Sequence, residues 1–353
     1  MSTAPHHHTA FPFEHVHRIL VIKLRAVGDV VLSSIVLNNI RAAFPSARLE
    51  VLTEPASESV VRSHPAVSGV LVFDAKRMSG LDLIRSVRAN RYDLIIDLFG
   101  NPRTALVTWL SGATHRVGFR FRGRAYAYNH CAEPRGGEVH NTQFNLDALA
   151  HVGIPVEDRS VRLHPSEEDR AYVEHFLNDA GLHWKTLVAI NTGGGWYTKR
   201  WGIDRFAALA DRIAETTGWT IILPWGPGQK DEVEDLRSRM KTAAFFPPPT
   251  TLLQLTALFE RTAYVVSNDS GPMHIAAAAG SRVLGIFGPT RPELQGPFGV
   301  QNATVRREGL ECLGCNLTSC TIGNLCMTEL SVDEVYAAFT RLLPAPSPEN
   351  LRP

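Results

Sequence analysis

The stretch RILVIKLRAVGDVVLSSIVLNNIRAAF, residues 18–44, decides the fold class. Its first seven residues, RILVIKL, form the continuous apolar run that is typical of a parallel strand buried on both faces. The turn RAVGD follows, and the apolar residues beyond it recur at helical spacing. A buried strand that leads directly into a helix is the repeating unit of a doubly wound parallel α/β sheet.

The same alternation continues along the chain and begins again after a polar segment. We predict further strands at 47–53, 69–74 and 92–100, and helices near 56–63, 79–90 and 140–154. The segment PVEDRSVRLHPSEEDR, 155–170, is polar with two prolines and is typical of a linker between domains. After it we predict strands at 187–191, 219–225, 263–269 and 281–288, and helices at 203–217, 229–240 and 331–343. We therefore expect two α/β domains, at 16–160 and 161–345.

The composition is that of an ordinary globular protein. The chain has 353 residues, of which 44% are hydrophobic and 20% charged, far from the composition of a disordered chain. The formal net charge of +1 gives no reason to expect general binding of nucleic acid. Residues 1–165 carry 19 Lys and Arg against 14 Asp and Glu, whereas the rest carries 17 against 21. This division fits two domains with different ligands.

No segment of the sequence predicts export or membrane insertion. No apolar run approaches the ~18 residues that span a bilayer. The start, MSTAPHHHTAFPFEHVH, has neither the basic nor the apolar region of a signal peptide and is a loose, His-rich leader. We expect a cytoplasmic protein, including the cytoplasmic face of the inner membrane.

Three predicted loops lie where a strand meets a helix, the edge at which open α/β sheets bind ligands. The first is RAVGD, from Arg25 to Asp29. Gly28 lets the backbone approach a ligand, and Asp29 lies at or near the cap of the next helix. The spacing fits a plain capping carboxylate and also a catalytic one.

The second loop is NTGGGWYTKRW, from Asn191 to Trp201. Successive glycines can expose backbone N–H groups to an anion, and Lys199 and Arg200 can offset phosphate charge. The order of a Walker A loop is absent, and a flexible surface loop fits the same letters.

The third loop is SNDSGPMH, from Ser267 to His274. Pro272 falls in the first turn of the predicted helix, where its missing N–H is harmless. The free N–H groups of a helix start are suited to pyrophosphate. Met273 by itself fits a core residue. The chain contains no D-x-D sequence, so helix dipoles, Lys and Arg must neutralise any bound phosphate.

These motifs, in this order, resemble those of the family 9 glycosyltransferases, the bacterial heptosyltransferases that extend the lipopolysaccharide inner core from ADP-heptose. The resemblance rests on KLRAVGDVVLSSIVLNNIRAAFP, NTGGGWYTKRWGIDRFAALADRI, LPWGPGQKDEVEDL and VSNDSGPMHIAAAAGSRVLGIFGPT, and runs from about residue 18 to 343. It implies a GT-B fold, with two Rossmann-like domains facing a central cleft. The acceptor would bind the N-terminal domain and the nucleotide sugar the C-terminal domain.

The resemblance also implies an inverting transfer that needs no metal and no cofactor. Asp29 falls on the family's general base, beside Arg25 and Gly28 on the acceptor side. The family's donor-phosphate positions fall on Thr192 and Lys199, and its loop for the diphosphate and sugar falls on Asp269, Ser270, Gly271 and His274. We add Gly193, Gly226, Glu232, Pro272 and Met273 to the predicted donor site, and expect Lys199 also to stabilise the leaving diphosphate. The chain has Gln229 where many members have Glu, which puts one sugar or ribose contact in doubt.

The segment HRVGFRFRGRAYAYNHCAEPRGG, 115–137, holds Arg120, Arg122 and Arg124 among aromatic residues. Arg is suited to bidentate phosphate contacts, so the segment fits a phosphorylated, lipid-linked acceptor or an anionic inner membrane. A solvated basic loop and an edge strand fit it too.

Four of the five cysteines lie close together, at Cys312, Cys315, Cys320 and Cys326. Four thiolates at this spacing can form a tetrahedral metal site such as Zn within 312–326, and the resemblance implies that such a site would be structural and could hold Fe. A group of buried thiols around a tight loop is the alternative. The preferred function is transfer of heptose from ADP-heptose to a lipopolysaccharide-core acceptor. Alternatives are another nucleotide sugar, a protein acceptor, and a non-catalytic nucleotide- or metal-binding protein on the same fold.

Overall fold

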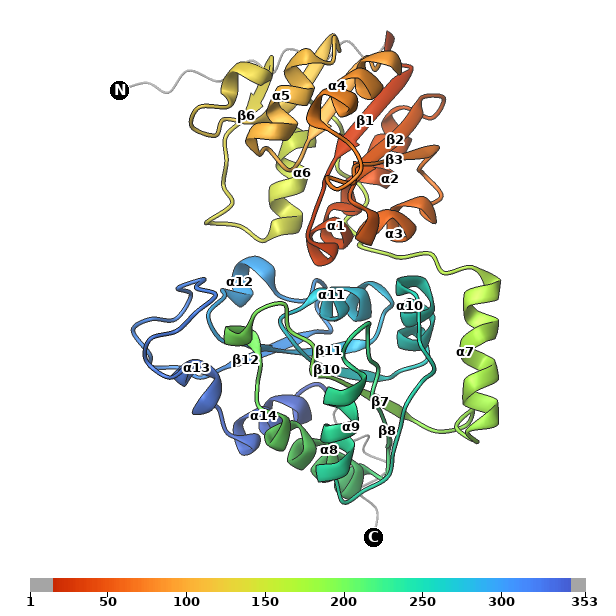
Figure 1. The fold of residues 1–353 in the computed structure, drawn as a ribbon, viewed down its shortest axis with the longest axis vertical. Coiled ribbons are helices and arrows are strands. Elements are labelled where there is room, and N and C mark those ends of the chain that lie inside the picture. Colours follow the sequence, from red (N-terminus) through yellow and green to blue (C-terminus); the bar gives the residue numbers. More distant parts are fainter. Residues whose placement is uncertain (1–14, 344–353) are drawn as a thin grey trace. The chain divides into compact units, whose positions relative to one another are not determined.

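The computed structural model describes residues 15–343, so most of the predicted leader lies outside the described residues. The chain divides into two units, Met1–His164 and Pro165–Pro353, a few residues beyond the boundary expected from the sequence. Each unit is a six-stranded parallel sheet covered by helices (Figure 1). The predicted α/β fold class is confirmed.

The N-terminal sheet is centred on β1, the strand formed by the RILVIKL stretch. Its strand order is β3-β2-β1-β4-β5-β6. In the sheet, Val21 lies opposite Val51 on one side and Ile96 on the other, and all three are buried. The strands are β1 (Arg18–Ile22), β2 (Arg48–Thr53), β3 (Gly69–Val72), β4 (Leu94–Asp97), β5 (His115–Phe119) and β6 (His130–Ala132).

The helix predicted after RAVGD is two helices, α1 (Val27–Ser33) and α2 (Ile35–Ala43). The hydroxyls of Ser33 and Ser34 donate to the carbonyls of Val30 and Val31 at 2.8 and 2.7 Å, in competition with the backbone ladder. The remaining elements are the short turns η2 (Pro55–Ser57) and η3 (Ala125–Ala127), and the helices α3 (Glu58–Arg62), α4 (Gly80–Ala89), α5 (Pro102–Leu110) and α6 (Asn141–His151).

The C-terminal sheet repeats this plan with the order β12-β11-β10-β7-β8-β9. At its centre Val266 lies opposite Ile190 and Leu284, all fully buried. The strands are β7 (Leu187–Asn191), β8 (Thr220–Ile222), β9 (Ala244–Phe245), β10 (Tyr264–Asn268), β11 (Arg282–Phe287) and β12 (Ala303–Arg306).

Several helices of the C-terminal unit, α7 (Glu167–Asp179), α10 (Leu252–Glu260), α12 (Pro292–Gln295) and α13 (Leu325–Thr328), were not predicted from the sequence. Helix α7 begins inside the segment predicted as linker, because Ser166 and Asp169 form a capping box there. The others are η4 (Tyr197–Lys199), α8 (Ile203–Thr217), α9 (Lys230–Arg239), α11 (Gly271–Ala278) and α14 (Val332–Thr340). Over residues 15–343, none of the helices combines the length and the apolar character that a membrane crossing requires.

Candidate active site

Asp29 lies in the first turn of α1, as its third residue, near the cap as the sequence suggested. The cap is Ala26, whose N–H donates to Asp29 Oδ2 at 3.1 Å. The other carboxylate oxygen, Oδ1, lies 3.4 Å from Nδ2 of Asn141, the first residue of α6. The side chain is half-buried. Two neighbours therefore fix the carboxylate while leaving it partly open to solvent.

Lys23, just after β1, is a nearby residue that the sequence reading missed. Its side chain is half-buried, and its ammonium donates to the carbonyl of Leu98 at 3.2 Å. Burial lowers the pKa of Lys23, while the carboxylates of Asp29 and Asp97 oppose that effect. In the sequence, Lys23 directly follows the apolar run ILVI of the predicted strand. A charged residue at that position is the signal from which its role could have been predicted.

Asp97 at the end of β4 is fully buried, and burial raises the pKa of its carboxyl group. Oδ1 accepts from the N–H groups of Phe99 and Gly100 at 3.0 and 2.8 Å, and Oδ2 accepts from the Tyr128 hydroxyl at 2.8 Å. The carboxyl group therefore holds the loop after β4 in place.

The predicted acceptor-side arginines have different environments. Arg25 and Arg122 are exposed, and Arg120 is held in an ion pair with Glu133 at 2.6 Å. The guanidinium of Arg124 stacks over the Phe121 ring, 5.0 Å from its centroid. This chain segment forms β5, η3 and the edge strand β6. Its aromatic residues at 119, 121, 126 and 128 lie outside β6, so the edge-strand alternative is wrong for them.

In the C-terminal unit, the glycine-rich loop and the SNDSGPMH loop are joined by two asparagines. Asn191 at the end of β7 donates to the hydroxyls of Ser267 and Ser270 at 2.8 and 3.1 Å. Asn268 at the end of the neighbouring strand β10 donates to the carbonyl of Thr192 at 2.7 Å. The adjacent parallel strands thus bring two of the predicted donor loops together.

Lys199 and Asp269 connect the same two loops through charge. Lys199 Nζ lies 2.7 Å from Asp269 Oδ2, and both side chains are largely buried. The same oxygen accepts from the Thr290 hydroxyl at 2.6 Å. Lys199 Nζ also lies over the Trp196 ring, 4.5 Å from its centroid. The ammonium is therefore held at the meeting point of both loops.

The predicted positions around 226–232 adjoin this cluster. Gln229 Oε1 accepts from the Gly226 N–H at 2.9 Å, and its Nε2 would stand 2.7 Å from a Cβ at Gly193, so only Gly fits there without a shift. Arg200 donates to the Gly194 carbonyl at 3.1 Å and faces Glu232 at 3.4 Å. Gln229 thus fills space above the glycine-rich loop, where a longer or charged side chain would change the site.

The third loop starts α11 at Gly271, with Ser270 at the cap position and Pro272 in the first turn. Within the described chain no side chain caps this helix. Pro272 has no N–H, and the Met273 N–H donates to the Ser270 carbonyl at 3.2 Å, so the Gly271 N–H is the one of these first three positions left for an anion. The Met273 side chain is fully buried, and a Cβ at Gly285 would meet its sulfur. Met273 therefore belongs to the core through its side chain, and His274 is buried beside it.

Comparison with known proteins identifies the family. The model of "Glycosyltransferase family 9 (heptosyltransferase)" matches residues 81–325. The chain belongs to this family. This glycosyltransferase is 26% identical over 376 residues to lipopolysaccharide heptosyltransferase 1 of Pseudomonas aeruginosa. The match covers 95% of this chain and 100% of the relative.

Solved structures confirm the GT-B fold of this glycosyltransferase. A family 9 glycosyltransferase from Veillonella parvula has a TM-score of 0.82 at 23% identity and covers 94% of this chain and 98% of its own. The Escherichia coli heptosyltransferase WaaC with ADP-2-deoxy-2-fluoro heptose has a TM-score of 0.72 at 19% identity. The match covers 92% of this chain and 100% of WaaC.

The arrangement of the four clustered cysteines of the glycosyltransferase does not support the predicted metal site. Cys312 and Cys315 are exposed, Cys320 Sγ accepts from the Asn324 N–H at 3.3 Å, and Cys326 is buried. Between residues 15 and 343, no group of three or more His, Cys, Asp or Glu is arranged to hold a metal ion. Burial raises the pKa of the Cys326 thiol to about 11, and negative charge on the thiolates of Cys312, Cys315 and Cys320 adds a smaller effect in the same direction. The alternative of grouped thiols fits better, although only Cys326 is buried.

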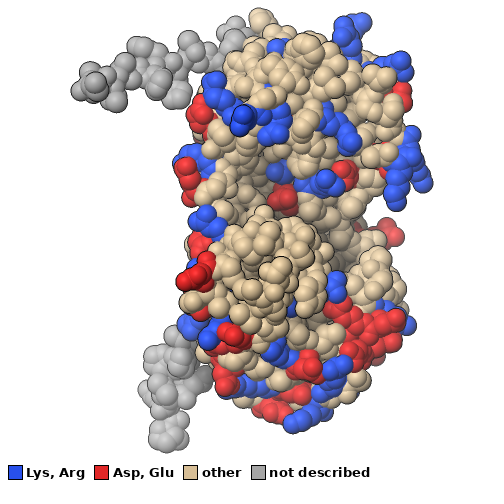
Figure 2. All heavy atoms as spheres, turned by 60° about the vertical axis from the view of Figure 1, so that its left-hand side comes forward, with Lys and Arg blue, Asp and Glu red and all other residues tan. Residues whose placement is uncertain are grey.

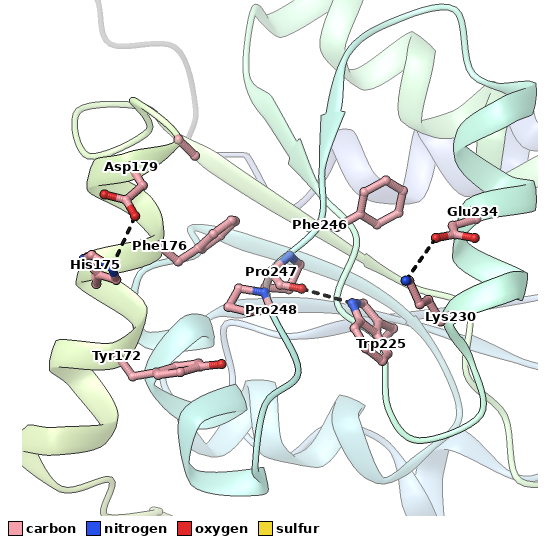
Figure 3. Close-up of a pocket in the computed structure, with 11 residues that line it drawn as sticks. Tyr172, His175, Phe176, Asp179, Trp225, Lys230, Glu234, Phe246, Pro247 and Pro248 are labelled. Atoms are coloured by element: carbon pink, nitrogen blue, oxygen red, sulfur yellow. Dashed lines mark hydrogen bonds and ion pairs between the residues drawn. The ribbon is translucent and has the colours of Figure 1, made fainter.

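A separate pocket of about 690 Å³ opens on the same unit (Figure 3). Its lining includes Tyr172 and Phe176 of α7, and Trp225, whose indole N–H donates to the Pro247 carbonyl at 3.0 Å. Its wall contains none of the predicted donor residues. The sequence reading missed this pocket because it missed α7.

Proposed function

We propose that this glycosyltransferase transfers heptose from ADP-heptose to a lipopolysaccharide inner-core or related lipid-linked acceptor, with inversion at the anomeric carbon. The observation that carries the proposal is the junction of the two donor loops at Lys199 and Asp269, in a member of the heptosyltransferase family. Its relatives include lipopolysaccharide heptosyltransferases, and the structure of one of them, WaaC, holds a fluorinated ADP-heptose, which supports the choice of donor.

In the proposed reaction the acceptor hydroxyl attacks the anomeric carbon as the bond to the diphosphate breaks. Negative charge grows on the departing ADP, and the Lys199 ammonium and the Gly271 N–H at the start of α11 stabilise that charge. Asp29 takes the proton of the attacking hydroxyl. Glycosyl transfer has an oxocarbenium-like transition state, so both effects act at the same moment.

The donor site is proposed to work without a metal ion. A fixed ammonium and a helix start supply the positive charge that a divalent cation supplies in other sites. The backbone at Thr192, Gly193 and Gly226 is proposed to approach the nucleotide. The ion pair with Arg200 holds Glu232 in place. On the N-terminal unit, Arg25, Arg120, Arg122 and Arg124 are proposed to meet acidic groups of the acceptor. The reaction is proposed to take place in the cytoplasm, at the inner face of the membrane.

The test is a transfer assay with ADP-heptose and lipopolysaccharide that lacks inner-core heptose, followed by NMR of the new glycosidic bond. We expect transfer with an anomeric configuration opposite to that of the donor. A thermal-shift panel of ADP, UDP and GDP accompanies it, in which ADP at about 100 times its Kd adds about 2.7 kcal/mol of stability. Selective stabilisation by UDP or GDP, or retention of configuration, would contradict the proposal.

A further inference from the structure

A buried hydroxyl ties the turn that carries Lys199 to the cysteine-rich part of the chain. Thr198 is the buried residue of η4, and its Oγ1 donates to the carbonyl of Leu317 at 2.8 Å. The two residues are 119 positions apart in the sequence. A single 3₁₀ turn has poor hydrogen-bond geometry of its own. The distant contact therefore helps to fix the backbone from which the Lys199 side chain starts.

The stretch of residues 312–320, called here the cysteine loop, also contacts the segment that holds Asp269. Asn316 has left-handed backbone with φ 56°, which Asn adopts more readily than most residues, and its N–H donates to the carbonyl of Pro289 at 2.7 Å. The next residue after Pro289 is Thr290, which is buried and donates its hydroxyl to Asp269 Oδ2 at 2.6 Å. Neighbouring residues of the cysteine loop thus support both sides of the ion pair at the donor site.

Together these contacts close a ring around the ion pair. Lys199 Nζ and Asp269 Oδ2 lie 2.7 Å apart on one side of the ring. On the other side, the hydroxyls of Thr198 and Thr290 and the N–H of Asn316 complete the connection through the cysteine loop. Buried hydroxyls keep their hydrogen bonds because leaving such a group or its partner unpaired is costly. The ring therefore restricts the position of the ammonium more than the ion pair alone would.

The cysteine loop gives this support without adding charge. From Cys312 to Met327 the chain has no Lys, Arg, Asp or Glu. Figure 2 turns this side of the C-terminal unit forward, and uncharged side chains cover a broad area there. The loop therefore brings no charge of its own that would compete with a bound diphosphate for the Lys199 ammonium.

We propose that Thr198 is a positioning residue of the donor site, which aims the Lys199 ammonium at the diphosphate through its hydrogen bond to the cysteine loop. Thr198 acts on the diphosphate only through Lys199. The inference rests on the proposed function, because it concerns how the cation for the leaving ADP is held. It also assigns a role to the cysteine loop that does not depend on its thiols.

The first test compares Thr198→Val, which has a similar shape without the hydroxyl, with Thr198→Ser, which keeps the hydroxyl. Loss of one hydrogen bond between neutral groups should raise the Kd of ADP roughly 2- to 12-fold in Thr198→Val, measured by calorimetry. The fall in kcat should be larger, since charge on the diphosphate grows towards the transition state. KM for the acceptor should not change, because the acceptor is proposed to bind the other unit. Thr198→Ser should behave like the wild type.

Thr256 of α10 provides a matched control. It is fully buried, and its hydroxyl also donates to a backbone carbonyl at 2.8 Å, that of Leu252. Thr256→Val should therefore lower the melting temperature about as much as Thr198→Val does, while ADP binding and kcat stay unchanged. A merely structural role of Thr198 would give the same result for both variants.

A second measurement needs neither donor nor acceptor. Acetic anhydride labels an amine faster when it is exposed and free to move, and mass spectrometry compares labelling of Lys199 with that of the exposed Lys76. Labelling of Lys199 should rise severalfold in Thr198→Val, and also in Thr290→Val, which removes the other hydroxyl of the ring. It should not rise in Thr198→Ser or Thr256→Val. Melting temperatures show which variants are folded, and if Thr198→Val is not, Thr290→Val takes its place.

The inference is overturned if Thr198→Val matches Thr256→Val in ADP binding and in labelling of Lys199, or if Thr198→Ser is as impaired as Thr198→Val. If the wild type binds no ADP but labelling of Lys199 rises in Thr198→Val and not in Thr256→Val, the proposed function fails and the positioning of the ammonium stands. If the wild type transfers heptose and the two Val variants behave alike, only this inference fails.

Discussion

Lys199 Nζ and Asp269 Oδ2 lie 2.7 Å apart in a largely buried ion pair that joins the glycine-rich loop to the loop before α11. The ammonium is thus fixed before any donor arrives, with its charge already partly offset by the carboxylate. A diphosphate that binds there meets an ordered cation rather than a mobile surface side chain.

Lys199→Ala should weaken binding of ADP as well as ADP-heptose, because both carry the diphosphate. A charge-assisted hydrogen bond contributes about 1.5–3 kcal/mol, so Kd should rise roughly 10- to 150-fold by calorimetry. The loss in kcat should be larger still, since negative charge on the diphosphate grows towards the transition state.

The neighbouring variant Arg200→Ala is the comparison, and its effect on ADP should be smaller because Arg200 faces Gly194 and Glu232. Lys199→Ala also leaves Asp269 buried without its cation, so the affinity is measured well below the melting temperature. Unchanged ADP binding in Lys199→Ala would show that the glycine-rich loop does not hold the phosphates.

Asp29→Asn should nearly abolish transfer while ADP affinity stays within a few-fold of the wild type. General-base catalysis is typically worth about 10²- to 10⁴-fold in rate, and the amide cannot accept the proton. Steady-state kinetics with the heptose-deficient acceptor measure the effect.

Asp82 gives a matched control, because it is the third residue of α4 just as Asp29 is the third residue of α1. Asp82→Asn should leave kcat unchanged. If Asp29→Asn behaved in the same way, Asp29 would be a structural residue of its helix and nothing more.

Transfer should continue in EDTA, because Lys199 and the start of α11 supply the positive charge at the diphosphate. The assay compares initial rates before and after chelation, and again after Mg²⁺ or Mn²⁺ is added back. A reversible loss of rate that only these ions restore would rule out the metal-independent mechanism.

The N-terminal unit should lose stability in acid through His64. Burial, with a smaller effect of the nearby His164, lowers the pKa of His64 to about 4, against the opposing charge of Asp158. His64 is therefore protonated below about pH 6.5 in the unfolded chain but only below about pH 4 in the folded chain, so acid favours the unfolded chain between these values. This residue alone should reduce the free energy of unfolding by up to about 3 kcal/mol between pH 7 and pH 4.

His64→Asn tests this, because an amide oxygen can still accept from the Ala66 N–H, which now donates to Nδ1 at 3.2 Å. Urea unfolding of the variant should depend less steeply on pH than that of the wild type. His17→Asn, at an exposed histidine, should not change the slope. Equal slopes for all three proteins would rule out His64 as a source of acid sensitivity.

Much of the fold follows from periodicity, and the failures have local causes. The helix at 203–217 matches α8 to the residue, because its apolar positions recur at helical spacing and Gly218 ends it with φ 68°. Two-residue β9 carries too little pattern to be predicted. Helix α7 was missed because its first turn is Glu-Glu-Asp, which resembles a polar linker unless the Ser166 cap is considered.

For the candidate site, motifs locate loops but not the contacts between them. Sequence spacing places Lys199 and Asp269 some 70 positions apart, and only the pairing of β7 with β10 brings them together. Lys23 was missed because the partial burial of its side chain depends on packing around β1. The cysteine spacing was misleading in another way, since short separations along the chain do not by themselves give metal-ligand geometry, and among the described residues no group of three or more ligands has it.

The paired asparagines Asn191 and Asn268 have a consequence for how this enzyme can change. Each amide supports the loop that follows the neighbouring strand rather than its own. A substitution in one loop should therefore alter the conformation of the other, and the free-energy effects of substitutions in both loops should not be additive. Altered nucleotide preference should arise more readily at Gln229, which lies outside this mutual support, than within either loop.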